Sequence, residues 1–269
     1  MRAPADLSGS LKYLLLRLNP FVQQAWTTHR ASGLKFRVSL RDVVGRTILR
    51  REAYEPDLTR WLLDQFQQGV PGVFVDIGAN IGWYSLQAAR STHVQRVVAV
   101  EPDAGNHRLL QANIARNGME ARIESVACAA GSQSGLARLH QYKASNLGRH
   151  SLLSDHGHGG SLVPVLTVDE LLNRMDLSDA PVAAIKIDVE GYEPWVLAGA
   201  SVTLQRTQAL LIELSPELSK AGGGDFADML DLIAEAGFVP RIWDASGPLP
   251  GFDGLRVYPS QVTVGFVRA

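Results

Sequence analysis

The sequence predicts an α/β protein built on a doubly wound, mostly parallel sheet. Three observations lead to this prediction. From residue 73 onward, short apolar strands alternate with helical segments, which is the pattern of β-α-β units. The strand at 73–76 runs directly into a glycine-rich turn that opens a helix. A β-rich stretch follows the last helix, and it predicts an antiparallel hairpin at one edge of the sheet.

The N-terminal part of the chain predicts a helix, a β-hairpin and a second helix. Residues 1–30 have a helical pattern that is interrupted at Pro20. The stretch 35–40 alternates polar and apolar residues as a half-buried strand does, and 47–50 is its expected hairpin partner. A helix over 57–68 places its apolar residues on one face. We expect this extension to pack on the α/β core.

The later elements follow in β-α-β order. The stretch 136–142 alternates and predicts an antiparallel insertion, and a loop rich in Gly, Ser and His covers 148–160. The expected strands and helices are, in order, the strand at 73–76, helix 80–91, strand 96–100, helix 103–117, strands 122–126 and 163–168, helix 168–174, strands 183–187 and 209–213, helix 225–236, and strands from 238 and at 262–267.

Charge and composition exclude several classes of function. The 269 residues carry 26 Lys and Arg against 27 Asp and Glu, so no global positive field would attract nucleic acid. The single cysteine, Cys128, excludes an intrachain disulfide and a cysteine-based metal site. The apolar run 11–18 is far shorter than the roughly 20 residues that span a bilayer. We expect a cytoplasmic protein without an integral membrane segment, and this run leaves a homodimer open.

The glycine-rich turn is the first motif that carries chemistry. It is written Asp76-Ile-Gly78-Ala79-Asn80-Ile-Gly82, and such a turn presents backbone amides at a helix N-terminus to a nucleotide-like cofactor. It lacks the full G-x-G-x-x-G of dinucleotide-binding folds. Asp76, two residues ahead of the first glycine, would repel a pyrophosphate but would accept hydrogen bonds from an ammonium group. S-adenosylmethionine carries such a group and has no phosphate.

Two further acidic motifs end the neighbouring strands. Glu101, followed by Pro102, closes the strand at 96–100, where a carboxylate can bind both hydroxyls of a ribose. Asp188 and Glu190 leave the carboxyl end of 183–187, which is the ligand-binding rim of an open α/β sheet. Charges at such a rim are costly to desolvate unless they bind something. We expect this pair to position or deprotonate the substrate, with Asp188 also touching the cofactor.

Other polar residues are weaker candidates. His150 is a candidate base in the 148–160 loop, for which a solvated surface loop is the simpler interpretation. Glu55, just ahead of Pro56, fits a wall of the cofactor site and the first turn of a helix equally well. We assign no metal ligand. Magnesium on Asp188 and Glu190 stays open, since hard cations prefer carboxylate oxygens, but it is not favoured.

Taken together, the motifs resemble the FkbM-type family of S-adenosylmethionine-dependent methyltransferases. The resemblance rests on the glycine turn, on Glu101-Pro102, on Thr167-Val-Asp-Glu-Leu171 and Lys186-Ile-Asp-Val-Glu-Gly-Tyr-Glu193, and on the segment 41–56 ahead of them. It implies a Rossmann-like methyltransferase domain over 71–269, with a loop insertion at about 136–165, behind an N-terminal extension over 1–70.

The resemblance also implies which residues do what. Cofactor contacts would fall on the glycine turn and Glu101, and the acidic motif of Asp188 and Glu190 would lie near the reacting methyl. The expected activity is in-line O-methylation of a small-molecule or glycan hydroxyl, with S-adenosylhomocysteine as product. Two alternatives stay open: an NAD(P)-dependent oxidoreductase, which shares the turn and the ribose acid, and a non-catalytic cofactor-binding protein of the same fold.

Overall fold

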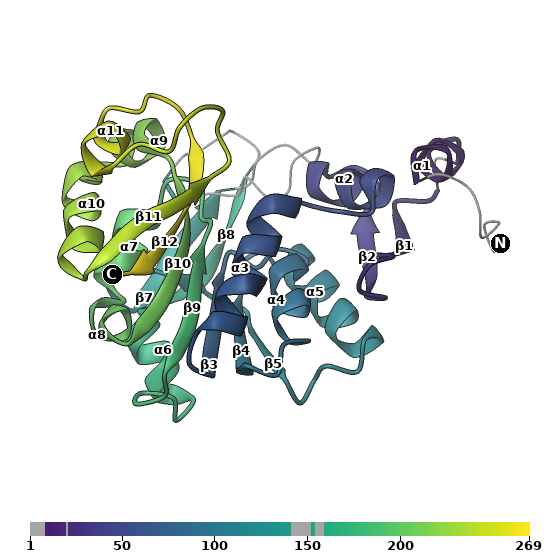
Figure 1. Ribbon diagram of the computed structural model, residues 1–269. Helices are drawn as coiled ribbons and strands as arrows, with labels where there is room; N and C mark the ends of the chain where they lie inside the picture. Colours follow the sequence, from purple (N-terminus) through teal and green to yellow (C-terminus); the bar gives the residue numbers. More distant parts are fainter. Residues whose placement is uncertain (1–8, 20, 141–151, 154–158) are drawn as a thin grey trace.

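The computed structural model describes residues 9–19, 21–140, 152–153 and 159–269. Its main sheet has seven strands (Figure 1). In chain order they are β3 (Gly72–Ile77), β4 (Val94–Val100), β5 (Ile123–Val126), β9 (Val182–Ile187), β10 (Thr207–Leu214), β11 (Phe238–Trp243) and β12 (Val262–Arg268). Across the sheet the order is β11-β12-β10-β9-β3-β4-β5.

This sheet is parallel except at one edge. The pairs from β5 through β4, β3 and β9 to β10 are all parallel. Strand β12 is antiparallel to both of its neighbours, β10 and β11. The predicted doubly wound sheet with an antiparallel edge hairpin is thus confirmed. The strand order reverses between β3 and β9, and open α/β sheets bind their ligands at the carboxyl ends of the strands beside such a point.

Helices cover both faces of the main sheet, because the side chains of β3 alternate between the two faces and are apolar on both. Val75 and Ile77 belong to the apolar cluster on one face, and Phe74 belongs to the cluster on the other. The face with Phe74 is covered by α3 (Pro56–Gln68), α4 (Trp83–Ala88) and α5 (Ala104–Arg116). The opposite face is covered by α6 (Val168–Arg174), α7 (Glu193–Ala198), α8 (Ser201–Gln205), α10 (Phe226–Glu235) and α11 (Phe252–Arg256).

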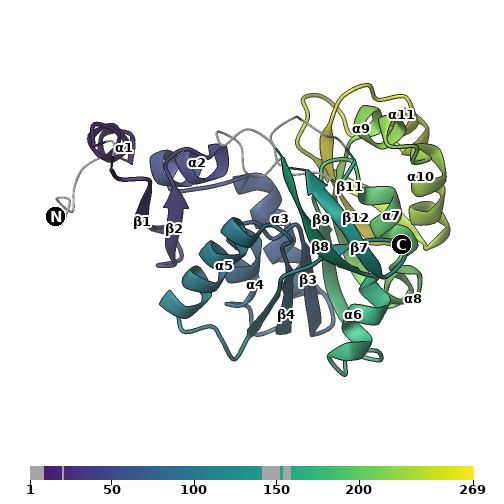
Figure 2. The same cartoon turned by 180° about the vertical axis from the view of Figure 1, so that it is seen from behind.

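A smaller sheet lies beside the α6 side of the main one (Figure 2). It has the order β6-β8-β7, with β6 (Ala129–Ala130), β7 (Gly135–His140) and β8 (Gly160–Leu166). Strands β7 and β8 are antiparallel, so the alternating stretch expected as an antiparallel insertion does form one. The loop that joins these two strands falls mostly outside the described residues. A further short helix, α9 (Pro216–Ala221), follows β10.

The N-terminal segment differs from the prediction in two places. It forms α1 (Gly9–Arg17), β1 (Gln24–Thr28), β2 (Lys35–Ser39) and α2 (Val43–Arg51), and the hairpin pairs β1 with β2. The expected hairpin partner at 47–50 is therefore wrong, because those residues lie in α2. Asp42 caps this helix, with Oδ2 accepting from the backbone N–H of Gly45 at 3.0 Å. The helical expectation for 24–28 is also wrong, since Trp26 and two threonines favour a strand there.

The hairpin packs on the α4–α5 side of the core. Asn113 of α5 accepts a hydrogen bond from the backbone N–H of Arg37 at 2.6 Å and donates to the carbonyl of Ile81 at 2.8 Å. Phe36 and Val38 join the same apolar cluster as α4 and α5. The expected domain boundary at residue 70 stays a prediction. Within the described residues, no helix has the length and apolar character needed to cross a bilayer.

Candidate functional site

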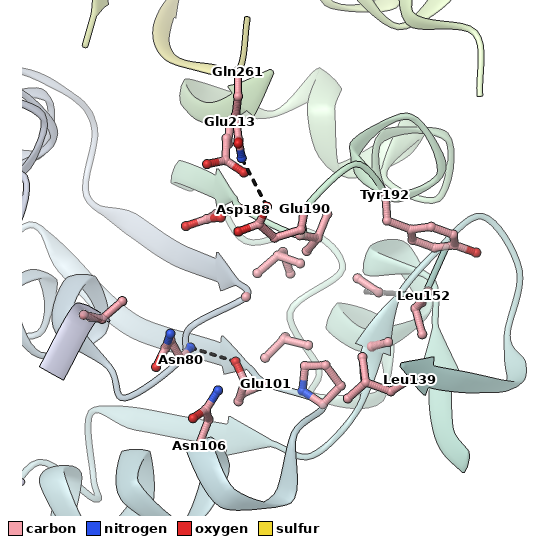
Figure 3. Close-up of a pocket in the computed structure, with 18 of the residues that line it drawn as sticks. Asn80, Glu101, Asn106, Leu139, Leu152, Asp188, Glu190, Tyr192, Glu213 and Gln261 are labelled. Carbon is pink, nitrogen blue, oxygen red and sulfur yellow. Dashed lines mark hydrogen bonds between the residues drawn. The ribbon is translucent and has the colours of Figure 1, made fainter. Parts of the chain in front are cut away.

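A pocket of about 300 Å³ opens at the carboxyl edge of the main sheet (Figure 3). Asn80, Glu101 and Asn106 lie at one end of it, and Asp188, Glu190 and Glu213 lie at the other. No Lys, Arg or His occurs among the described residues that line it. The described part of the lining is therefore acidic, and it favours a positively charged ligand over a phosphate.

The glycine turn forms the floor of this pocket because of a very close backbone approach. Gly78 has a φ of +75°, and a Cβ at this position would lie 1.9 Å from the carbonyl oxygen of Asp188. The backbone N–H groups of Gly78 and Ala79 both donate to the carbonyl of Val100 at 3.0 Å. The turn is thus held between the ends of β4 and β9. Only glycine fits there, because it has no Cβ and adopts a positive φ without strain.

Two other residues of the turn have mainly structural surroundings. Gly82 has a φ of +88°, and a Cβ there would lie 2.5 Å from Cδ1 of Leu110, so this glycine allows α4 to pack against α5. Ala79 is buried and does not line the pocket. The role that the sequence predicts for each of them at the cofactor stays a prediction.

Asn80 offers the pocket an unused hydrogen-bond acceptor. Its backbone adopts a left-handed conformation with a φ of 52°. Its backbone N–H donates to Oε2 of Glu101 at 2.8 Å. Its side-chain Oδ1 is buried and has no hydrogen-bond partner in the part of the chain that the structure describes. A buried acceptor of this kind is costly unless a donor, here one from a ligand, approaches it.

Glu101 is held in place by backbone donors and keeps acceptor capacity for a ligand. Its Oε1 accepts from the N–H of Asp103 at 2.9 Å, and its Oε2 accepts from Asn80. A carboxylate has about four lone-pair sites, so two hydrogen bonds leave room for two hydroxyl donors. Burial raises the pKa of this carboxyl to about 7, and the two backbone donors oppose that rise. The adjacent Pro102 also lines the pocket.

Asp76 does not reach the pocket surface. It is fully buried within β3, where its Cα is paired with that of Lys186 in β9. Its Oδ2 accepts from the Ser85 hydroxyl at 2.6 Å, and its Oδ1 lies 3.7 Å from the Lys186 ammonium. Burial raises the pKa of Asp76, and Lys186 opposes the rise. The structure thus places this acid behind the glycine turn, while the ammonium contact expected for it stays a prediction.

Lys186 is a member of the site that sequence reasoning missed. Its Nζ lies 3.2 Å from Oδ2 of Asp188 and donates to the carbonyl of Gly78 at 3.1 Å. Burial alone would lower the pKa of Lys186, but the carboxylates of Asp188, Asp76 and Glu55 outweigh it and raise the pKa above its ordinary value. The signal in the sequence was a lone lysine inside an otherwise apolar strand.

Asp188 and Glu190 are brought together with a third acid, Glu213 of β10. One carboxylate oxygen from each lies within 4.8 Å of the others. Gln261, from the segment ahead of β12, donates to Oε2 of Glu190 at 3.2 Å (Figure 3). Burial, followed by the charges of Asp188 and Glu190, raises the pKa of Glu213 well above its ordinary value. Sequence reasoning missed Glu213 too, although an acid near the carboxyl end of a buried strand is a usable signal.

The turn that carries Asp188 and Glu190 is shaped by Glu193. This side chain is fully buried, and its Oε1 accepts from the backbone N–H groups of Gly191 at 3.0 Å and Val189 at 3.4 Å. Burial raises the pKa of Glu193 to about 8. Glu193 therefore closes the loop after β9 by accepting from two of its backbone N–H groups.

The remaining candidates lie around or beyond the pocket. Tyr54 lines it, whereas Glu55 lies just behind, where its Oε2 accepts from the Tyr84 hydroxyl at 2.6 Å. Burial and the charge of Asp188 raise the pKa of Glu55. His150, with the neighbouring His156 and His158, lies outside the described residues. Cys128 is buried, and burial raises the pKa of its thiol to about 11.

Comparison with known proteins identifies the family. The model of the methyltransferase FkbM domain matches residues 76–240, a span that runs from Asp76 through the glycine turn and both acidic motifs. The chain belongs to the FkbM methyltransferase family. The resemblance noted from the motifs is thereby confirmed.

Members of the FkbM family and other relatives share limited identity with this chain. It is 26% identical over 199 residues to the AMB antimetabolite synthetase AmbE of Pseudomonas aeruginosa, covering 62% of this chain and 9% of that protein. It is 25% identical over 205 residues to the hexuronic acid methyltransferase AglP of Haloferax volcanii, covering 76% of this chain and 78% of that protein. A solved FkbM methyltransferase from Methylobacillus flagellatus aligns with a TM-score of 0.44 and 22% identity, covering 72% of this chain and 43% of that one.

Proposed function

We propose that this protein is an S-adenosylmethionine-dependent methyltransferase that methylates a hydroxyl group of a sugar or a related small molecule. The observation that carries the proposal is the pair Asn80 and Glu101 at one end of an acidic pocket. The family of the chain supports methyl transfer over the hydride transfer of an oxidoreductase.

The residues present fit this cofactor. Glu101 has the spare lone pairs to accept from two ribose hydroxyls, and the orphaned Oδ1 of Asn80 suits an additional donor. The acidic lining suits the positive sulfonium and ammonium groups and disfavours a pyrophosphate. Asp76 would act one step removed, by holding Lys186 against the glycine turn.

The acids at the other end of the pocket would handle the acceptor. When bound, the cofactor supplies a methyl group whose bond to sulfur breaks, with the electron pair staying on sulfur, as a bond to the acceptor oxygen forms. Glu190 would take the proton that this oxygen gives up, and general-base help of this kind contributes about 10²–10⁴-fold. Asp188, paired with Lys186, would orient the acceptor. Alignment of the reacting atoms supplies up to about 7–11 kcal/mol.

The nature of the acceptor is suggested by one relative. AglP is described as a hexuronic acid methyltransferase, and the chain matches most of its length. On this basis we infer a sugar-like acceptor that carries a hydroxyl. Methylation of an amine or of another natural product is the alternative that an acceptor screen would distinguish.

Calorimetry with S-adenosylhomocysteine tests the cofactor proposal. We expect the wild-type chain to bind S-adenosylhomocysteine and not NAD, and Glu101→Gln to bind at least tenfold more weakly, because the amide loses one charged acceptor for the ribose. Glu120→Gln, at an exposed position outside the pocket, is the matched control and should bind as the wild type does. Binding of NAD without binding of S-adenosylhomocysteine would refute the proposal.

A further inference from the structure

We propose that helix α1, the turn after it and the edge of β1 form a surface that docks on a bilayer containing anionic lipids. The sequence has an apolar run here that is too short to span a bilayer, and it leaves a homodimer open. Side-chain exposure and local charge favour contact with a membrane surface. We call this part of the molecule the N-terminal docking surface, and its exposed apolar residues are Leu14, Leu15, Leu18, Phe21 and Trp26.

Helix α1 has apolar side chains on its outer face as well as on its inner face. Tyr13 and Leu16 pack into the apolar cluster that contains the buried residues of α2. Leu14 and Leu15 are about half exposed, and Leu18, whose backbone N–H continues the helical bonding to Leu14, is 73% exposed. A surface helix of a globular protein normally turns polar residues toward solvent. The outer face of α1 therefore fits an apolar partner.

The turn after α1 and the strand β1 extend this apolar face. Phe21 is 92% exposed, and its backbone N–H donates to Oδ1 of Asn19 at 3.0 Å. Half of the large apolar side chains that are exposed in the described part of the chain fall within residues 11–26, so they form a cluster rather than a scatter. Leu, Phe and Trp are the side chains that interfacial helices bury at the boundary between headgroups and acyl chains.

The charge of this part of the chain is strongly positive. Residues 9–52 contain nine Lys and Arg against two acids, Asp42 and Glu52, whereas the whole chain carries 26 against 27. Asp42 is buried as the cap of α2, and Glu52 is paired with Arg30 at 2.7 Å. The N-terminal segment therefore has an excess of positive charge, which the headgroups of anionic lipids attract.

Three of the basic side chains near the apolar cluster are placed by printed contacts of known length. The Lys12 ammonium donates to the carbonyl of Trp26 at 3.0 Å. The guanidinium carbon of Arg50 lies 5.8 Å from the centre of the Tyr13 ring, and that of Arg116 lies 5.7 Å from the centre of the Trp26 ring. Positive charge thus borders the apolar residues on α1 and β1, as it does in helices that lie in a membrane interface.

A second copy of the chain and a nucleic acid are the competing occupants. A twofold dimer would place the same basic side chains of both copies opposite one another, which is unfavourable. A nucleic acid would match the charge, but its phosphate backbone gives the leucines no apolar partner. An anionic bilayer offers both, because its headgroups attract the basic residues and its acyl boundary takes up the apolar ones.

The docking surface and the pocket share helix α2. Val43 and Val44 of α2 line the pocket. On the same helix, the carbonyl oxygen of Leu49 lies 2.4 Å from where a Cβ would be at Gly9, so α1 packs closely on α2 (Figure 1). A protein docked by this surface would hold the pocket beside the bilayer. Any use of that position for methyl transfer rests on the proposed function, whereas the docking itself does not.

Co-sedimentation with lipid vesicles tests the docking surface. The full chain is mixed with vesicles of phosphatidylcholine alone, or with about 30% phosphatidylserine, at low and at high salt. We expect binding to the anionic vesicles only, and weaker binding at high salt, because salt screens the basic residues. The double variants Leu18→Ser/Phe21→Ser and Arg17→Gln/Arg50→Gln should each bind at least tenfold more weakly, since they remove the apolar and the charged contribution separately.

The double variant Leu136→Ser/Leu162→Ser is the matched control. It removes apolar side chains of comparable exposure from β7 and β8, away from α1 (Figure 1), and should bind anionic vesicles as the wild type does. Every variant should keep the thermal midpoint of the wild type, because the replaced side chains are exposed. No binding to anionic vesicles, or unchanged binding in both variants of the docking surface, would overturn the inference.

Two further results would also overturn it. One is a dimer in analytical ultracentrifugation that Leu18→Ser/Phe21→Ser dissociates, since the surface would then belong to a second copy. The other is tighter binding to a single-stranded oligonucleotide than to anionic vesicles. Calorimetry with S-adenosylhomocysteine in the absence of lipid is a separate readout, so failure of the docking surface and failure of the proposed function are distinguishable.

Discussion

Lys186 connects more parts of the candidate site than any other side chain described above. It bridges the buried Asp76 and the pocket acid Asp188, and it donates to the carbonyl of Gly78 in the glycine turn. Removing one partner from a buried ion pair leaves an uncompensated charge, which typically costs about 3–5 kcal/mol. The position of Asp188 at the pocket therefore depends on an ion pair that lies beneath the pocket floor.

The raised pKa of Glu101 predicts a pH dependence of cofactor binding. Burial raises this pKa from 4.5 to about 7, so the carboxylate form, which under the proposed function would accept from ribose hydroxyls, is incomplete below neutral pH. If only that form binds, the affinity for S-adenosylhomocysteine should rise by up to about tenfold between pH 6 and pH 8. Calorimetry across this range measures it.

The same raised pKa of Glu101 lowers the stability of the folded state. Because the pKa is higher in the folded state than in the unfolded state, the free energy of unfolding falls as pH rises from 4.5 to about 7. Below pH 4.5 the carboxyl is protonated in both states, and it makes no such contribution. Glu101→Gln is the control for both effects, since it has no proton to lose. An affinity that is equally pH-dependent in this variant would contradict the assignment to Glu101.

The sequence predicted some site residues better than others for a reason of strand geometry. Glu101, Asp188 and Glu190 follow the ends of their strands, and all three line the pocket. The sequence also suggested that Asp76 ends its strand, but β3 continues to Ile77. Asp76 therefore lies inside the strand, and its side chain is buried. Glu213 joins them only through the pairing of β9 with β10, a long-range contact that local pattern does not contain.

The turn between β3 and α4 is the element on which the pocket floor depends. Gly78 needs a positive φ, and it must also lack a side chain because the turn contacts the end of β9 closely. Gly33, in the β1–β2 hairpin, also has a positive φ, of +73°, but nothing lies within 4 Å of a Cβ placed there. The two glycines therefore separate backbone strain from steric conflict.

Alanine at these two positions should give different losses of stability. Gly33→Ala should cost about 1–2 kcal/mol, the price of a left-handed backbone for an L-residue. Gly78→Ala should cost about 1–3 kcal/mol more, because the new methyl group must displace the backbone of Asp188. Urea unfolding measures both free energies. Equal losses would mean that the turn moves away from β9 without cost.

Local capping explains where the prediction of elements failed. The sequence suggested 47–50 as the hairpin partner of the strand at 35–40, but Asp42 caps a helix there, and Ile48 and Leu49 are buried on it. A cap is worth about 1 kcal/mol, enough to decide between two weak local preferences. The long periodic segments, such as α3, α5 and α10, follow the prediction closely because their apolar faces are unambiguous.

At the level of the whole molecule, Asn113 ties the N-terminal hairpin to the α/β core. It contacts the backbone of Arg37 in β2 and of Ile81 in the glycine turn. The order of the core could be predicted from the alternation of strands and helices. The attachment of the hairpin could not, since residues more than seventy positions apart meet through side-chain to backbone hydrogen bonds.

Replacing Asn113 should loosen the hairpin before the core. In Asn113→Ala the N–H of Arg37 loses its acceptor, at a cost of about 1–3 kcal/mol. Amide hydrogen exchange should speed up in β2 while β9 keeps its protection. Asn173→Ala, at an exposed position in α6 on the other face of the sheet, is the matched control. Equal acceleration in β2 and β9 would show that the hairpin and the core open as one unit.

The antiparallel strand β12 has a consequence for the order in which the molecule assembles. It lies between β10 and β11, yet the ribosome makes it after both of them. During synthesis the edge of the sheet must therefore stay open until β12 inserts, and contacts that wait for distant parts of a chain form slowly. Gln261, which donates a hydrogen bond to Glu190, lies directly ahead of β12 and is made with it. The end of the pocket that holds Glu190 is thus among the last parts of this fold to be completed after translation.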